Sequence, residues 1–130
     1  MTTAAGYVRV PSLLVGVNKP LDPRNLSDLE KTHLPVITAP QSVKKNEFFD
    51  VQVEVGATLM HPNDCGHFIM DIELYADETF LARAVLTPGA VAPDVAFRIR
   101  LRDATAQLLA YCACNVHGRW VGCKEIAVEL

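Results

Sequence analysis

The sequence has no excess of basic residues and no long hydrophobic run. Its 130 residues carry 12 Lys and Arg against 15 Asp and Glu, a formal net charge of -3, whereas proteins that bind a nucleic acid backbone normally present positive charge. The longest apolar run near the start, residues 13–17, is too short to cross a bilayer, and no secretory signal pattern accompanies it. We therefore expect a cytoplasmic protein that binds neither nucleic acid nor membrane.

Cysteine and histidine are also scarce, with four residues of each. Four cysteines allow two disulfides, but the cysteines of a cytoplasmic chain more often stay reduced or bind metal. Half of the residues are hydrophobic and 21% are charged, a globular composition unlike that of disordered chains. The length suits one domain, so we expect a single domain over residues 1–130.

The chain divides into an irregular start and a strand-rich remainder. Three prolines within residues 1–30 predict an extended arm, with at most a short helical turn at residues 25–30. From residue 48 onward apolar and polar residues alternate, which is the period of a half-buried strand. The clearest example is the row Val95, Phe97, Ile99 and Leu101, interleaved with Arg98, Arg100 and Arg102.

Strands are predicted at residues 35–37, 49–55, 68–74, 79–86, 95–101, 107–114 and 124–130. About seven short strands with no long amphipathic helix between them predict an all-β fold, an immunoglobulin-like antiparallel β-sandwich. Its core is expected over residues 31–130, and a closed barrel is the alternative architecture.

The four histidines lie in or beside predicted loops, and three of them have a second potential metal ligand close by. His61 and His67 share one connection, Cys114 and His117 are three residues apart, and His33 stands alone. A single loop histidine is normally solvated and without a role. Two such pairs on one sandwich indicate a metal site, because a short loop fixes two donors at little ordering cost.

The donor types narrow the choice of metal. Imidazole and thiolate suit zinc, copper or iron and not magnesium or calcium. A blue-copper site is disfavoured because no methionine follows residue 70 to serve as its axial ligand. A structural zinc site remains an alternative, with Cys65, Cys112, Cys114 and Cys123 as donors, although Cys112 and Cys114 are closer together than the cysteines of usual zinc sites.

Five stretches together resemble one known family. They are DLEKTHLPVI at residues 28–37, VKKNEFFDV at 43–51, HPNDCGHFI at 61–69, ELYAD at 73–77 and CNVHG at 114–118. In this order they resemble the superoxide reductases, the desulfoferrodoxin and neelaredoxin family, from about residue 28 to the C-terminus. The two-iron members carry a cysteine-rich N-terminal rubredoxin-like domain, and this chain has no cysteine before Cys65, so the resemblance is to the one-iron type.

The resemblance implies a mononuclear non-haem iron that cycles between Fe2+ and Fe3+ and reduces superoxide to hydrogen peroxide. Its implied ligands are four equatorial imidazoles and one axial thiolate, with the sixth position open: His33, His61, His67, His117 and Cys114. An axial sulfur pushes electron density toward whatever binds opposite to it. The resemblance also implies rubredoxin or a similar small iron protein as electron donor, and a homo-oligomer, either dimer or tetramer.

In the family, a Glu-Lys pair directly precedes the first histidine ligand, where the lysine attracts superoxide and the glutamate can occupy the sixth position. Here Thr32 separates Glu30 and Lys31 from His33. The resemblance implies Lys31 and Glu30 as catalytic residues, and the long lysine stem can compensate for the displacement. The alternative for both is a solvated pair at the end of a helical turn.

Two other functions stay open beside the enzyme. One is an iron-binding electron carrier or sensor on the same fold, and the other is a zinc-binding or metal-free interaction module of the sulfur-carrier type. Among the remaining cysteines, Cys112 alternates with apolar neighbours and is expected to be buried as a small apolar side chain. Cys65 and Cys123 are expected to be inert.

Overall fold

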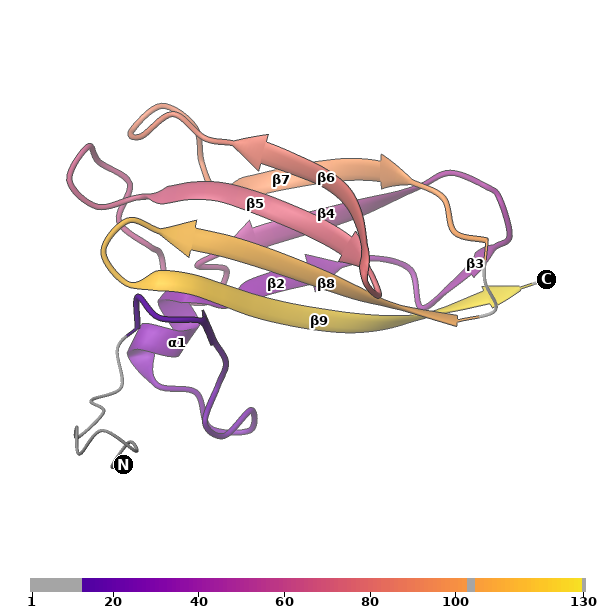
Figure 1. The fold of residues 1–130 in the computed structure, drawn as a ribbon, viewed down its shortest axis with the longest axis horizontal. Helices are drawn as coiled ribbons and strands as arrows, with labels where there is room; N and C mark the ends of the chain where they lie inside the picture. The colour runs from indigo at the N-terminus through magenta and orange to yellow at the C-terminus, as the bar shows by residue number, and fades with distance from the viewer. Residues whose placement is uncertain (1–12, 103–104, 130) are drawn as a thin grey trace, which may run out of the picture.

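The computed structural model describes residues 13–102 and 105–129, which form two β-sheets packed face to face with a short helix at one end (Figure 1). The larger sheet has six strands in the order β1-β9-β8-β5-β6, and β3 also pairs with β9. Its strands are β1 (Val17–Asn18), β3 (Ser42–Lys44), β5 (Ile69–Ala76), β6 (Thr79–Val85), β8 (Thr105–Cys114) and β9 (Gly118–Glu129).

The smaller sheet has three strands in the order β2-β4-β7. They are β2 (Pro35–Thr38), β4 (Phe49–Val55) and β7 (Asp94–Ile99), and the helix α1 spans Asp28–His33. The predicted all-β sandwich is therefore confirmed. No helix among the described residues has the length and apolar character needed to cross a membrane.

Alternating strands supply the core between the two sheets. In β4, Val51, Val53 and Val55 are at most 3% exposed, whereas Gln52 between them is exposed. The strand predicted at residues 49–55 is confirmed at both ends. The alternation in β7 is confirmed as well, because the apolar residues face inward while the arginines face solvent.

The predicted strand boundaries are wrong where a strand is very short, or where a glycine interrupts the alternation of apolar and polar residues. β1 and β3 have two and three residues, too few for alternation to show, and each pairs in parallel with β9. β9 begins at Gly118, six residues before the predicted start at residue 124. The helix lies at Asp28–His33 and not at residues 25–30. Of the predicted arm, residues 1–12 lie outside the described residues.

A β-bulge in β5 changes which side chains of this strand are buried. The sequence predicts an inward row that includes Met70, but Ile69 is 3% exposed and Met70 is 38% exposed. The pairing of β5 with β8 shifts register between Ile69 and Asp71. Because a bulge inserts one unpaired residue, the inward row restarts at Ile72 on the far side of it.

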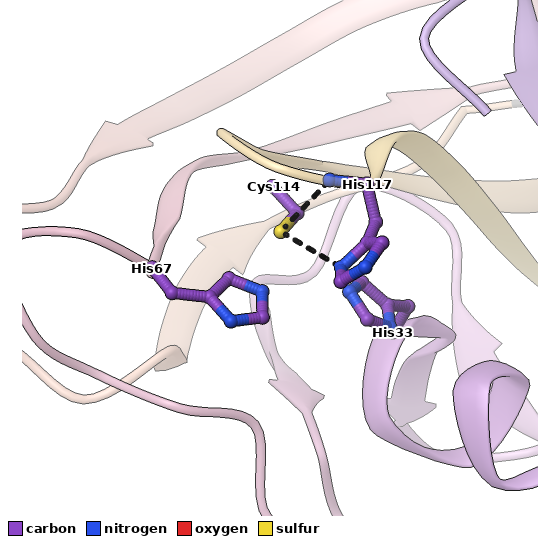
Figure 2. Close-up of side chains that lie close together, drawn as sticks. All are labelled: His33, His67, Cys114 and His117. Carbon is purple, nitrogen blue, oxygen red and sulfur yellow. Dashed lines mark hydrogen bonds between the residues drawn. The ribbon is translucent and has the colours of Figure 1, made fainter. Parts of the chain in front are cut away.

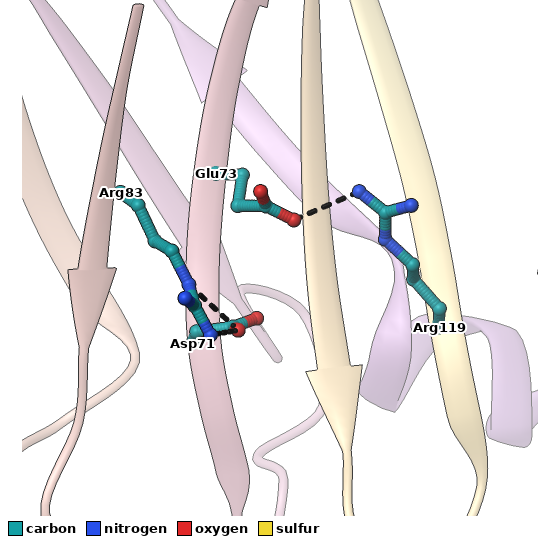
Figure 3. A network of polar contacts seen from close by, with 4 residues as sticks. All are labelled: Asp71, Glu73, Arg83 and Arg119. Carbon is teal, nitrogen blue, oxygen red and sulfur yellow. Dashed lines mark hydrogen bonds and ion pairs between the residues drawn. The ribbon is translucent and has the colours of Figure 1, made fainter. Parts of the chain in front are cut away.

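Two ion pairs cross the outer face of the larger sheet (Figure 3). Arg83 of β6 donates to Asp71 of β5 at 2.6 Å, and Arg119 of β9 donates to Glu73 of β5 at 2.8 Å. The Arg119 guanidinium also lies 4.2 Å from the centre of the Tyr111 ring on the intervening β8. The contacts of Arg119 tie the start of β9 to β5 and β8, whereas the Arg83 pair joins β6 to β5.

Gly122 allows strands from the two sheets to approach closely beside α1. It lies on the inward side of β9, and a Cβ built on it would be 2.1 Å from the backbone oxygen of Pro35 in β2. Pro35 follows α1 by one residue, since Leu34 is the C-cap of that helix. Because Gly122 has no side chain, β2 can lie close to β9, and this keeps α1 near the N-terminal half of β9.

Replacing Gly122 with alanine is expected to lower stability by about 1–3 kcal/mol, because the new methyl group must push β2 away from β9. Gly66→Ala is the matched control, since the nearest atom to its new Cβ would be 3.5 Å away. Thermal unfolding followed by circular dichroism measures both variants. Equal midpoints for the two would contradict this account of the close approach.

Candidate metal centre

The segments that carry five potential metal ligands lie at the end of the sandwich where α1 is found (Figure 1). His33 is the last residue of α1, and Cys114 is the last residue of β8. His61 and His67 lie on the connection between β4 and β5, while His117 lies in the turn between β8 and β9. The sandwich thus brings together donors from three separate stretches of the chain.

The donor atoms converge on one point. One ligand atom from each of His33, His67, Cys114 and His117 lies within 4.8 Å of the others (Figure 2). The fifth residue, His61, joins them because its Nε2 lies 3.1 Å from Nε2 of His33, and its ring centre is 4.7 Å from that of His67. In the described ranges, no other group of three or more potential ligands converges.

Backbone carbonyls determine which nitrogen is available in two of the imidazoles. Nδ1 of His33 lies 2.8 Å from the oxygen of Leu29, and Nδ1 of His61 lies 2.6 Å from the oxygen of Pro62. Because a carbonyl only accepts, each Nδ1 carries the proton and donates it. Both Nε2 atoms are then left with a lone pair, which is the arrangement typical of histidines that bind metal.

The surroundings of the Nε2 atoms of His33 and His61 favour a bound cation. Burial lowers the pKa of His33 to about 4 and also lowers the pKa of His61, so both rings are neutral at pH 7. Two lone pairs that face each other at 3.1 Å repel. The separation is close to the roughly 3 Å expected between neighbouring nitrogens that bind one metal through bonds of about 2.1 Å.

The other donors fit the same cation. Nε2 of His67 is buried and has no hydrogen-bond partner, which is costly for a polar atom unless something binds it. Cys114 is 1% exposed, and its sulfur accepts the backbone N–H of His117 at 3.4 Å and lies 3.9 Å from Nδ1 of that residue. Imidazoles combined with a sulfur donor suit iron, copper or zinc, so the residues fit a transition metal.

Side chains around the donors hold them in place. The Trp120 ring stacks on His33 with the ring centres 5.1 Å apart, and its indole N–H donates to the backbone oxygen of His117 at 3.1 Å. The thiol of Cys112 donates to the backbone oxygen of His33 at 3.1 Å. Cys112 is fully buried, as predicted, but the sequence did not predict this bond or the role of Trp120.

Asn115 links the two loops that carry most of the donors. Its side-chain oxygen accepts the N–H of Phe68 at 2.9 Å, and its amide nitrogen donates to the oxygen of Gly66 at 3.0 Å. It therefore fastens the residues on both sides of His67 to the loop between Cys114 and His117. The sequence offered one signal for this residue, its place inside the CNVHG stretch at 114–118.

Residues 25–123 match the family model described as Desulfoferrodoxin. The chain belongs to the desulfoferrodoxin family. A solved superoxide reductase (neelaredoxin) from Ignicoccus hospitalis is 42% identical, with a TM-score of 0.70, and the match covers 75% of this chain and 82% of that one. A curated relative from Methanocaldococcus jannaschii is 36% identical over 106 residues, which are 79% of this chain and 89% of the relative.

A solved superoxide reductase from Nanoarchaeum equitans is 26% identical, with a TM-score of 0.65, and the match covers 74% of this chain and 94% of that one. The family predicted from the sequence is thus confirmed.

The carboxylate of Glu30 is bonded to backbone N–H groups at and before the start of α1. One carboxylate oxygen accepts the backbone N–H of Ser27 at 2.8 Å, and the other accepts that of Leu21 at 2.9 Å. In return the Ser27 hydroxyl accepts the N–H of Glu30, which completes a capping box at the start of α1. Both oxygens are therefore used in holding the helix, and these bonds lower the pKa of Glu30.

Lys31 lies in the last turn of α1, two residues before His33, and is half-buried. The remaining cysteines do not form a site of their own, because Cys112 is buried while Cys65 and Cys123 are exposed. The four-cysteine zinc site considered from the sequence is not formed in the described part of the chain.

The capping role of Glu30 predicts a pH-dependent loss of stability in Glu30→Gln. Because folding lowers the pKa of Glu30 from 4.5, its ionised form stabilises the protein above that pH, and this stabilisation is lost as the pH falls through the folded-state pKa. The variant should therefore unfold at a lower temperature near pH 7, and the difference should vanish in acid. Circular dichroism at equal metal content measures this.

Glu78→Gln is the control for this experiment, since Glu78 is exposed in the turn between β5 and β6. It should match the wild type at every pH. Identical midpoints for wild type and Glu30→Gln near neutral pH would show that the carboxylate does not support α1.

Proposed function

We propose that this protein is a superoxide reductase, which transfers one electron to superoxide at a single iron and releases hydrogen peroxide. The observation that carries the proposal is the convergence of four imidazoles and one cysteine sulfur at a buried point. The proposed ligands are His33, His61, His67, His117 and Cys114. The names of the solved relatives from Ignicoccus hospitalis and Nanoarchaeum equitans support the same reaction.

The donor set favours iron over the other metals that imidazole and thiolate bind. A structural zinc ion takes four closed tetrahedral donors, whereas His61 adds an imidazole as a fifth donor beside the four that lie within 4.8 Å of one another. Five protein ligands leave one position open on a six-coordinate metal. Iron bound at this site supplies the electron by passing from Fe2+ to Fe3+.

The protein side chains prepare the site for this electron transfer. The carbonyls of Leu29 and Pro62 hold two rings with Nε2 toward the metal, so little rearrangement is needed when it binds. The Cys114 thiolate raises the electron density available to the substrate. His33, His61 and Cys114 are at most 2% exposed, whereas His67 and His117 are half-buried, so a small anion would approach from their side.

Lys31 is proposed to attract the substrate. Superoxide is an anion and the chain has a net charge of -3, so the overall field opposes its approach. A lysine ammonium two residues from a metal ligand reverses this locally and raises the rate of encounter. Glu30 is proposed to support the site from the start of α1, through the bonds described above.

The electron donor is proposed to be a separate small iron protein such as rubredoxin. Met60, next to His61, is 85% exposed, and Val116, next to His117, is 44% exposed, so apolar surface lies close to the ligands for a transient contact. We also infer that the chain forms a homo-oligomer and works in the cytoplasm.

Replacing Cys114 with serine should abolish the sulfur-to-iron charge-transfer band of the oxidised, iron-loaded protein, because the only sulfur among the converging donors is lost. Visible absorption after oxidation measures the band. Cys123→Ser is the matched control, since Cys123 is exposed on β9, and it should keep the band. A band that persists in Cys114→Ser would mean that another cysteine binds the metal.

Replacing Lys31 with alanine should slow the second-order reaction with superoxide by roughly threefold to tenfold at low salt, because an attractive charge has been removed. The rate should also depend less on ionic strength. Pulse radiolysis over a range of salt concentrations measures both effects.

The matched control for Lys31→Ala is Lys44→Ala, which removes an exposed lysine of β3 at the opposite end of the sandwich (Figure 1). This variant has the same net charge as Lys31→Ala, so a general charge effect would slow both equally. If the two variants had the same rate and the same dependence on salt, Lys31 would have no specific part in the reaction.

A further inference from the structure

Thr32, the residue inserted before the first histidine, has its hydroxyl directed at the backbone and ring that hold the metal ligand. Its Oγ1 lies 2.8 Å from the oxygen of Leu29 and 2.7 Å from Nδ1 of His33. The third side of this triangle is the 2.8 Å bond from Nδ1 of His33 to the oxygen of Leu29. All three atoms are thus within hydrogen-bond distance of one another.

Only one arrangement of protons satisfies the triangle. The oxygen of Leu29 can only accept, so the hydroxyl proton of Thr32 and the Nδ1 proton of His33 both point toward it. The Nδ1 proton is then shared between the Leu29 oxygen and the Thr32 Oγ1, as a three-centre bond. Threonines in helices often bond to a carbonyl one turn back, but that habit does not require the contact with the ring.

We propose that Thr32 is a positioning residue of the metal centre, whose hydroxyl fixes the orientation and tautomer of His33. The inference rests on the proposed metal site. Two acceptors on Nδ1–H oppose transfer of the proton to Nε2 and make Nε2 a stronger donor to the metal. Trp120 stacks on the ring, and Cys112 bonds the backbone oxygen of the same residue, so the hydroxyl completes the fixation of His33.

This assignment also separates the two positions that precede the ligand. The hydroxyl of Thr32 is hydrogen-bonded to Leu29 and lies within hydrogen-bond distance of His33, so this residue supports the helix and the imidazole ring. The attraction of the anion is left to Lys31, one position earlier. Thr32 therefore supports the ligand His33, and Lys31 is left to attract the substrate.

The test uses zinc, which is diamagnetic and carries out no redox chemistry, so it does not depend on superoxide reduction. Thr32→Val keeps the side-chain shape and removes the hydroxyl, whereas Thr32→Ser keeps the hydroxyl. Thr38→Val is the matched control on the exposed side of β2. Competition with a chelator measures zinc affinity, and proton-nitrogen NMR of the zinc-loaded protein reports the Nδ1–H resonance of His33.

We expect Thr32→Val to bind zinc about tenfold more weakly, as changes beside metal ligands usually do, and to shift the Nδ1–H resonance upfield with faster exchange. Thr32→Ser and Thr38→Val should match the wild type in both measurements. Equal affinity and an unshifted resonance in folded Thr32→Val would overturn the role of Thr32 alone. A wild-type protein that binds neither zinc nor iron would overturn the proposed metal site, and this inference with it.

Discussion

Two backbone carbonyls, those of Leu29 and Pro62, constrain the whole site. By accepting the Nδ1 protons of His33 and His61 they leave two lone pairs that face each other at 3.1 Å. Burial keeps these rings neutral, as the lowered pKa values show, so protonation does not relieve the repulsion at pH 7. A metal ion bound there would relieve it, and metal binding would then be coupled to the stability of this end of the protein.

The scaffold holds these carbonyls through several small contributions and not through one strong contact. The capping box begins α1 at Ser27, a bond usually contributing about 1 kcal/mol, and Gly122 lets the following strand lie close against β9. The thiol of Cys112 fixes the C-terminal end of the helix, while Asn115 fastens the two ligand loops to each other. The last three links join segments that are far apart in sequence, so they form only when the sandwich has folded.

The distribution of charge fits a site that receives a small anion. On the outer face of the larger sheet, Asp71 and Glu73 are each paired with an arginine, so this acidic pair is locally neutralised. The donor cluster itself contains no carboxylate, and both oxygens of Glu30 are bonded to backbone N–H groups. The sulfur of Cys114 would hold the proposed iron as a thiolate, and its negative charge would favour electron donation to the substrate.

Much of the fold could be predicted because its signals are local. Period-two alternation over seven residues identified β4 at both ends, and the arginine-interleaved row identified β7. The pattern failed at β9, where Gly122 breaks the inward row, and at β5, where the bulge at Met70 reverses it. In both places a contact with another strand decides the backbone, and that contact leaves no trace in the neighbouring residues.

By itself, the sequence predicted the donor residues, because ligand pairs within one short loop and the family's motifs can be read along the chain. Only the tertiary structure decided which nitrogen of His33 and of His61 is bonded to a carbonyl, that Glu30 caps a helix, and that Thr32 contacts His33. The physical reason is that a hydrogen bond depends on the position of its partner in space. Here those partners depend on where α1 begins and on how closely β2 and β9 pack beside it.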